Sequence, residues 1–330
     1  MDTLYIIISK TSQLAGKSCE RGVNSVLKHV EIAEQHFERA CKEQNIDLHT
    51  DVIYRTNHAF EGILKEAYSF LTGQSADRVT PYDIETYFVE NNIFHSRVME
   101  LFTNYRVQWR NPSTHDYQLV FTEQEAFLAI LNVSAFISIL LDQILERIAY
   151  NQEVQNLEGR VESIRESINL ATTESLSNKI ARLLLSFSDD LKKNIKQQEI
   201  PTENQITGAL TGYIETIFPS LKINVESNIE YGGRTIRPDF VLEDGEEKVI
   251  LEIKRSLVVP GFRPKIEHSS HIQQLLHYLE GSQVDNGILF VFPTVDNFSM
   301  TTKQIKLETP NGIRNISIIS PEIFINGFEA

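Results

Sequence analysis

The sequence predicts an α+β protein with two folded parts, an all-α N-terminal domain and a C-terminal α/β domain. Apolar residues recur every three or four positions from about 23 to 200, which is the spacing of amphipathic helices. After Pro201 the pattern changes to short apolar runs separated by Gly232-Gly233 and Asp244-Gly245, which is typical of strands joined by tight turns. A length of 330 residues also suits two separate cores.

The composition is that of a soluble globular protein. Apolar residues make up 41% and charged residues 23% of the chain. The longest apolar segment, Ala126 to Leu141, contains polar residues and is shorter than the ~20 residues that span a bilayer, so we expect a buried helix and no membrane partner. The N-terminus has neither the basic start nor the apolar stretch of a signal peptide, and we expect a cytoplasmic protein.

The cysteines and histidines do not suggest a metal site. Only Cys19 and Cys41 are present, with no CxxC pair and no clustering with histidines, which fits a reducing cytoplasm and argues against zinc bound by cysteine. Three histidines share one predicted helix (His268, His271 and His277). Because no carboxylate motif accompanies them, we expect groove-facing or surface side chains.

The net charge of −14 argues mildly against a nucleic-acid partner, since phosphate binding relies on Lys and Arg. A binding site needs only a local basic patch, however. Such a patch surrounds Lys254, and its candidate nucleic-acid-binding residues are Arg234, Arg237, Arg255, Arg263 and Lys265.

The chain divides into three segments on these patterns. Residues 1–150 form the helical domain, 151–201 a helical connector and 202–330 the α/β domain. In the helical domain, residues 110–115 form a short punctuated stretch between helical runs at 84–109 and 123–149. In the α/β domain we expect helices at 203–218 and 265–279 and strands at 222–231, 235–242, 248–255 and 287–292.

Three residues of the predicted strands carry the chemistry of the α/β domain. Asp239 is followed after twelve residues by Glu252-Ile253-Lys254. Side chains two apart on a strand share a face, so Glu252 and Lys254 project together, and the Asp-Gly turn brings Asp239 onto the neighbouring strand. Two carboxylates make an oxygen site suited to Mg²⁺ or Mn²⁺, which can activate a water for phosphodiester hydrolysis. Lys254 can position that water or neutralise the phosphate.

This pattern resembles the PD-(D/E)XK nuclease superfamily, with its restriction-endonuclease-like fold, over Thr202 to Ser320. Glu215 stands on the preceding helix, where that superfamily often supplies a further acidic ligand, and Glu203 lies on the same predicted helix. Gln274 and Tyr278 resemble the Gln-x-x-x-Tyr signature of its RecB-type branch, which implies that they assist at the active site. The motif is short, and an alternative is an edge strand with Glu252 and Lys254 as a solvated charge pair.

The punctuated stretch of the helical domain carries Arg110, Asn111 and His115. Arginine can hold a phosphate, and histidine can act as general acid or base near neutral pH. The spacing resembles the Arg-x(4–6)-His motif of the HEPN superfamily, over Val23 to Tyr150. That resemblance implies a homodimer whose composite cleft cleaves RNA without metal. The alternatives are an ordinary helix-capping turn and a HEPN bundle that only dimerises.

Together these features predict a metal-dependent nuclease that hydrolyses DNA with Mg²⁺ or Mn²⁺. One alternative is a metal-independent RNase effector with the C-terminal domain as nucleic-acid sensor. Another is a non-catalytic nucleic-acid-binding dimerisation module. Both resemblances imply a role in prokaryotic defence against phage or plasmids.

Overall fold

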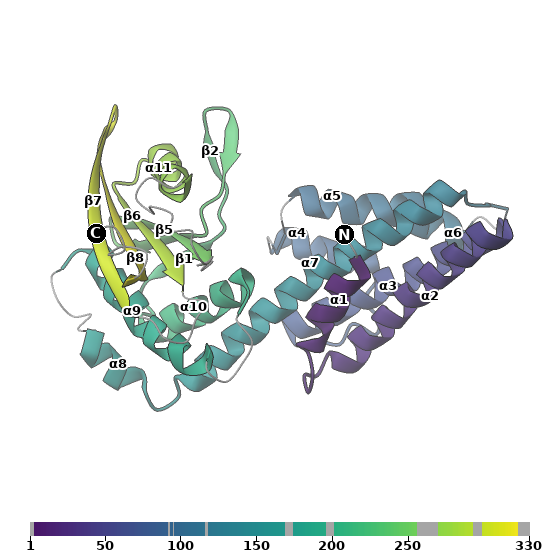
Figure 1. Ribbon diagram of the computed structural model, residues 1–330, viewed down its shortest axis with the longest axis horizontal. Helices are drawn as coiled ribbons and strands as arrows, with labels where there is room; N and C mark the ends of the chain where they lie inside the picture. The colour runs from purple at the N-terminus through teal and green to yellow at the C-terminus, as the bar shows by residue number, and fades with distance from the viewer. Residues whose placement is uncertain are drawn as a thin grey trace. The chain divides into compact units, whose positions relative to one another are not determined.

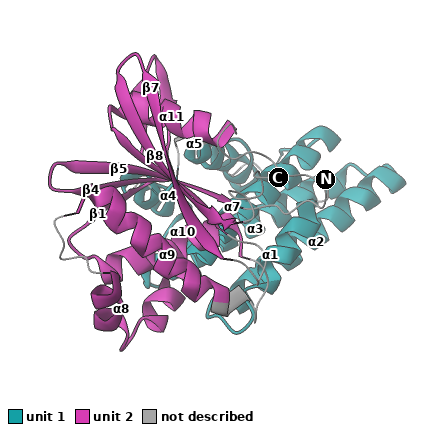
Figure 2. Cartoon of the chain, turned by 60° about the vertical axis from the view of Figure 1, so that its left-hand side comes forward, with its two compact units in different colours: residues 1–147 teal, residues 148–330 magenta. Residues whose placement is uncertain are grey.

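The computed structural model describes residues 3–91, 93–94, 96–115, 118–168, 174–195, 201–255, 270–292 and 299–322, without the side chains at 96, 97, 115 and 193–195. The chain forms two compact units, residues 1–147 and 148–330 (Figure 2). The first unit is helical, and the second combines helices with a mixed six-stranded sheet, so the protein is α+β as predicted.

The first unit is built around a hairpin of two long helices (Figure 1). Its elements are α1 (Thr3–Ser12), α2 (Glu20–Glu43), α3 (Asp47–Thr72), α4 (Pro81–Glu90), α5 (Ser96–Tyr105), η1 (Arg106–Arg110), α6 (Asn111–His115) and the first part of α7 (Glu123–Asn156). The connection between α2 and α3 is short, with Gln44 in the left-handed conformation, so the two helices run antiparallel. The rings of Phe60, Tyr105 and Phe136 meet at 4.8 to 5.8 Å and place the core between α3, α5 and α7.

Helix α7 contains the apolar segment Ala126 to Leu141. The helix is long and apolar enough to cross a membrane by length and composition alone, and 56% of its most apolar 18-residue window is buried inside the fold. A core helix of a soluble protein has the same properties, and Ala126, Val133 and Ile137 are fully buried here. The structure therefore agrees with the expectation of a buried helix.

The second unit holds the sheet. Its elements are α8 (Val161–Ile168), α9 (Leu176–Ile195), α10 (Glu203–Ile217), β1 (Lys222–Val225), β2 (Ile229–Tyr231), β3 (Arg234–Ile236), β4 (Phe240–Asp244), β5 (Glu247–Arg255), α11 (Ser270–Ser282), β6 (Asn286–Phe292), β7 (Met300–Thr309) and β8 (Gly312–Pro321). The strand order is β1-β4-β5-β6-β8-β7, with β5, β6 and β8 parallel and the outer pairs antiparallel. Strands β2 and β3 form a separate hairpin.

Helices cover both faces of the sheet. Buried residues of α8, α9 and α10 pack on one face, against Leu251 and Ile253 of β5. Helix α11 covers the other face and packs on Ile250. Because side chains alternate along a strand, Glu252 and Lys254 of β5 belong to the α11 face.

In the second unit, three features differ from the sequence-based expectation. Residues 151–201 are not a connector, because α8 and α9 bury apolar side chains in the core under the sheet. The expected strands 222–231 and 235–242 are each broken in two, at Glu226 with φ 48° and at Pro238, which has no amide hydrogen to donate. The hairpin of β7 and β8 was not predicted.

The stretch 110–115 is helical rather than a punctuated loop. Turn η1 is a π-helical turn in which the amide of Asn111 donates to the carbonyl of Arg106, and α6 follows without interruption. Pro112 lacks an amide hydrogen, and its ring crowds the carbonyl four residues earlier, so a widened turn just before it lets the helix continue. The structure therefore contradicts the alternative of an ordinary capping turn at 111–114.

Candidate active site

Asp239 and Glu252 are brought together by the antiparallel pairing of β4 and β5. Asp239 directly precedes β4, where Phe240 pairs with Leu251, so the next register position faces Glu252. The amide of Ile253 donates to Oδ2 of Asp239 at 2.7 Å, and the amide of Asp239 donates to Oε2 of Glu252 at 3.4 Å. Two carboxylates thirteen positions apart in sequence thus converge, as predicted.

Lys254 completes this cluster. Its Nζ lies 2.7 Å from Oε1 of Glu252 and 3.9 Å from Oδ2 of Asp239. The side chain of Glu252 is 1% exposed, whereas those of Asp239 and Lys254 are 28% and 20% exposed. Glu252 therefore forms the floor of the site, and the other two residues open to solvent.

The electrostatics of the cluster favour an additional cation. Burial, and after it the charge of Glu252, raises the pKa of Asp239 well above its usual range. Burial also raises the pKa of Glu252, although the Lys254 ammonium opposes this. Burial lowers the pKa of Lys254, but its hydrogen bond to Glu252 and the nearby carboxylates outweigh burial and raise it overall. One ammonium thus faces two carboxylates, of which Glu252 is buried and Asp239 is partly exposed, and a further positive charge would favour the ionised form of both.

A third carboxylate, Glu203, acts on this cluster. Glu203 is exposed in the first turn of α10, which begins with a capping box of Thr202 and Gln205. Its charge shifts the pKa values of Asp239, Glu252 and Lys254. The acidic helix residue expected near the site is therefore present.

The sequence-based choice of Glu215 for this role is wrong. Glu215 lies twelve residues after Glu203 on the same helix, which is about 18 Å along the helix axis. Its carboxylate accepts a 2.6 Å hydrogen bond from the Tyr150 hydroxyl. The charge of Glu203 acts on Asp239 and Glu252, whereas Glu215 is hydrogen-bonded to Tyr150.

Gln274 and Tyr278 lie on α11 above the same face of the sheet. The Gln274 amide donates to the Tyr278 hydroxyl at 2.7 Å, one helical turn away. Burial raises the pKa of Tyr278, and the charges of Glu252 and Asp239 raise it further. Tyr278 therefore lies within electrostatic reach of the carboxylate cluster.

His271 lies close enough to the cluster for the charges of Lys254 and Glu203 to act on it, whereas the sequence suggested only a groove-facing or surface side chain. It precedes Gln274 by three positions and Tyr278 by seven, so all three occupy one face of α11. Burial, and after it the charge of Lys254, lowers the pKa of His271, while Glu203 raises it. Its spacing of three residues from Gln274 on a predicted helix is the feature of the sequence that could have indicated this position.

The structure divides the predicted basic patch. Arg255 ends β5 and is exposed next to Lys254, and Arg234 is exposed on the β2–β3 hairpin. Arg237 is engaged by Glu226, donating to its backbone carbonyl at 2.6 Å and to its carboxylate. Arg263 and Lys265 lie outside the described residues.

In the helical unit, Arg110 is held by an acid. Its Nε donates to Oε1 of Glu61 at 2.6 Å, and its Nη1 donates to Oδ1 of Asn111 at 3.1 Å. His115 ends α6, and its side chain lies outside the described part of the chain. A joint Arg110–His115 pocket therefore stays a prediction.

A comparison with protein-family models finds no model that matches the chain, and a comparison with curated proteins finds no match either.

Proposed function

We propose that the second unit is a metal-dependent nuclease of restriction-endonuclease-like fold that hydrolyses phosphodiester bonds in DNA. The observation that carries the proposal is the cluster of Asp239, Glu252 and Lys254 on one face of two adjacent strands. Each residue type has a use in phosphodiester hydrolysis, and the order of elements around them is the one that the superfamily resemblance implies.

The residues present fit a divalent cation. Asp239 and Glu252 offer oxygen donors of the kind that Mg²⁺ and Mn²⁺ prefer, and Glu203 would be the third acid. An added cation would favour the ionised form of Asp239 and Glu252. When bound, such an ion activates a water and stabilises the charge that develops on the phosphate.

The remaining side chains have roles in holding and orienting the substrate. Lys254, kept charged by Glu252, neutralises a phosphate oxygen or orients the attacking water. The Tyr278 hydroxyl, fixed by Gln274, orients the nucleic-acid backbone. His271 and Arg255 add positive or hydrogen-bonding groups along the same path.

A solvated charge pair on an edge strand would explain these residues less well. Strand β5 lies inside the sheet between β4 and β6, and Glu252 is 1% exposed. Burying charges costs folding free energy, so a charged cluster without a function would not be expected at a buried position. Clusters of buried ionisable groups with shifted pKa values are typical of functional sites.

The first unit is proposed as a HEPN-like helical domain that forms a homodimer. RNA cleavage by Arg110, Asn111 and His115 is the alternative activity, but the ion pair of Arg110 with Glu61 already occupies the guanidinium that would hold a phosphate. DNA hydrolysis therefore ranks first. The proposed setting is the prokaryotic cytoplasm, in defence against phage or plasmids.

The experiment that tests this function is an assay of the purified chain on DNA and on RNA, with Mg²⁺, with Mn²⁺ and with EDTA. We expect DNA cleavage with either metal and none in EDTA. DNA cleavage that persists in EDTA, or no DNA cleavage under any condition, would overturn the proposal.

A further inference from the structure

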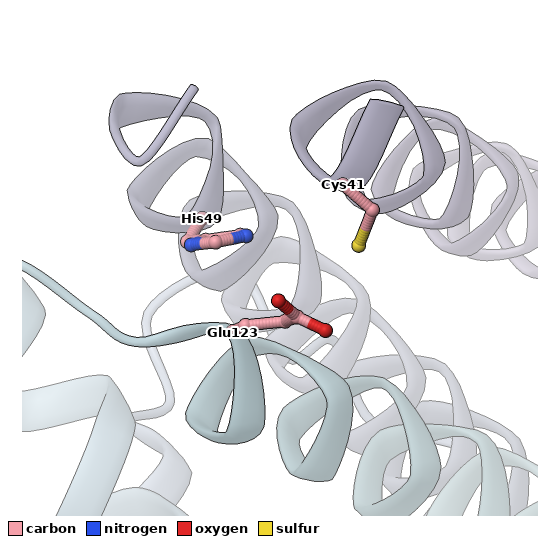
Figure 3. Close-up of side chains that lie close together, drawn as sticks. All are labelled: Cys41, His49 and Glu123. Carbon is pink, nitrogen blue, oxygen red and sulfur yellow. The ribbon is translucent and has the colours of Figure 1, made fainter. Parts of the chain in front are cut away.

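Three helix ends of the first unit bring a thiol, an imidazole and a carboxylate together. Cys41 lies in the last turn of α2, His49 in the first turn of α3, and Glu123 is the first residue of α7 (Figure 3). Their potential ligand atoms all lie within 4.8 Å of one another. This cluster is separate in residues and chemistry from the carboxylate centre of the second unit.

The contacts that the structure describes do not explain why the polar ring of His49 is buried. Its side chain is 7% exposed, and neither ring nitrogen has a hydrogen-bond partner among the described residues. The ring lies 6.3 Å from the Phe37 ring and points toward the space between Cys41 and Glu123 (Figure 3). Burying polar nitrogens without partners costs free energy, so a ligand in that space would stabilise the fold.

Cys41 and Glu123 can satisfy their polar groups without a bound ion. Cys41 and Glu123 are exposed and close enough for the thiol to hydrogen-bond the carboxylate. This contact satisfies two of the three groups but offers nothing to the imidazole. A cation that binds all three satisfies His49 as well.

The donor set identifies the kind of cation. Sulfur, nitrogen and oxygen donors together are typical of zinc, whereas Mg²⁺ and Ca²⁺ prefer oxygen alone. In a tetrahedral site with bonds of about 2.0 to 2.3 Å, ligand atoms lie about 3.5 Å apart. Because Cys41 and Glu123 are exposed, rotation of their side chains can supply the closure of about 1 Å that this requires.

We propose that Cys41, His49 and Glu123 bind a zinc ion. Three protein ligands leave a fourth position, which a water fills from the exposed side. The ion joins the turn of the α2–α3 hairpin to the beginning of α7, two points that are far apart in sequence. Zinc at this site would hold these two points of the helical unit together, and it is independent of the metal that the proposed nuclease centre uses.

The test is a zinc titration of the purified full chain, freed of metal beforehand, against a chromophoric chelator. A Glu252→Gln background removes the carboxylate centre as a second site. Cys41→Ser and Glu123→Gln remove ligands at exposed positions, where misfolding is not expected. Cys19→Ala and Glu43→Gln are the matched controls, since they remove the other cysteine and an exposed acid near Cys41.

We expect one zinc ion per chain in the background protein and in both controls. Cys41→Ser and Glu123→Gln should each weaken binding by more than about 100-fold, because even an outer-shell partner contributes about 10- to 100-fold. With Co²⁺, a thiolate charge-transfer absorption should appear and be lost in Cys41→Ser. Absence of zinc binding in the background protein, or native affinity in Cys41→Ser, would overturn the inference.

Discussion

The backbone amide of Ile253 donates a 2.7 Å hydrogen bond to the carboxylate of Asp239. The Ile253 side chain is buried in the core on the opposite face of the sheet. The residue between Glu252 and Lys254 therefore anchors the other acid of the cluster through its backbone, while its side chain anchors the strand. The position of Asp239 depends on strand pairing and not on loop conformation.

Glu203 and Glu215 provide a matched pair of variants on one helix. Glu203→Gln should lower metal-dependent DNA cleavage, because it removes the third acid from the cluster of Asp239 and Glu252. Glu215→Gln should leave the rate unchanged, since that residue bonds Tyr150 instead. Initial rates at several Mg²⁺ concentrations would show this. Equal losses in the two variants would contradict the assignment.

Glu153 should make folding stability depend on pH. Burial raises its pKa from the ordinary value to about 7, so the folded chain holds a proton that the unfolded chain has lost between these values. The free energy of unfolding should therefore fall as pH rises from about 4.5 to about 7. Glu153→Gln should be more stable than the native chain at pH 8, by about 1 to 3 kcal/mol, and similar at pH 4.5.

Urea unfolding of the two proteins at both pH values measures this difference. Glu158→Gln is the control, because Glu158 is exposed five residues away. If the Glu153 variant follows the native pH dependence, the carboxyl is not titrating as proposed.

A site residue can be predicted from the sequence when local structure places its side chain. It cannot be predicted when the packing of distant segments places it. Glu252 and Lys254 were predictable because strand alternation puts them on one face, and a turn between short strands brings Asp239 beside them. The sequence could not decide between Glu203 and Glu215, because that choice depends on where α10 lies along the sheet. The cluster of Cys41, His49 and Glu123 could not be predicted for the same reason, since Glu123 is distant from the other two residues in sequence.

The β7–β8 hairpin could be predicted from the sequence. The β7–β8 hairpin has alternating apolar and polar residues on both sides of Pro310-Asn311-Gly312, a recognisable turn sequence. Gly312 has φ 124°, a conformation that side-chain-bearing residues rarely adopt. The π-helical turn at 106–110 was not predictable in this way, because Pro112 usually indicates the end of a helix.

The helical unit should form a homodimer. The HEPN resemblance places the two-fold axis near Arg110, and Val107 is exposed on the preceding turn. Val107→Asp should therefore shift sedimentation equilibrium toward the monomer, because a charge would be buried in the interface. Ile46→Asp, at an exposed position in the α2–α3 connection, should not. A native chain that is strictly monomeric at micromolar concentration would count against the composite RNA site.

A second activity, if the helical unit has one, should differ from the first in its need for metal. RNA cleavage should persist in EDTA, leave a 2′,3′-cyclic phosphate and vanish in Arg110→Ala and His115→Ala. Glu61→Gln should increase it, because the Arg110 guanidinium would lose its ion-pair partner. The RNA cleavage rate of Cys41→Ser, measured in the same assay, shows whether loss of the proposed zinc ion affects this activity. RNA that stays intact under every condition would make this unit structural.

The most direct test of the nuclease assignment is the DNA cleavage rate of Glu252→Ala in Mg²⁺, compared with Lys254→Ala, Glu215→Ala and the native chain. Loss of a metal ligand should abolish cleavage in Glu252→Ala, and Lys254→Ala should lose about 100-fold, as expected for a positioned catalytic group. Glu215→Ala should cleave at the native rate. A Glu252→Ala protein that cuts DNA as fast as the native chain would contradict the account.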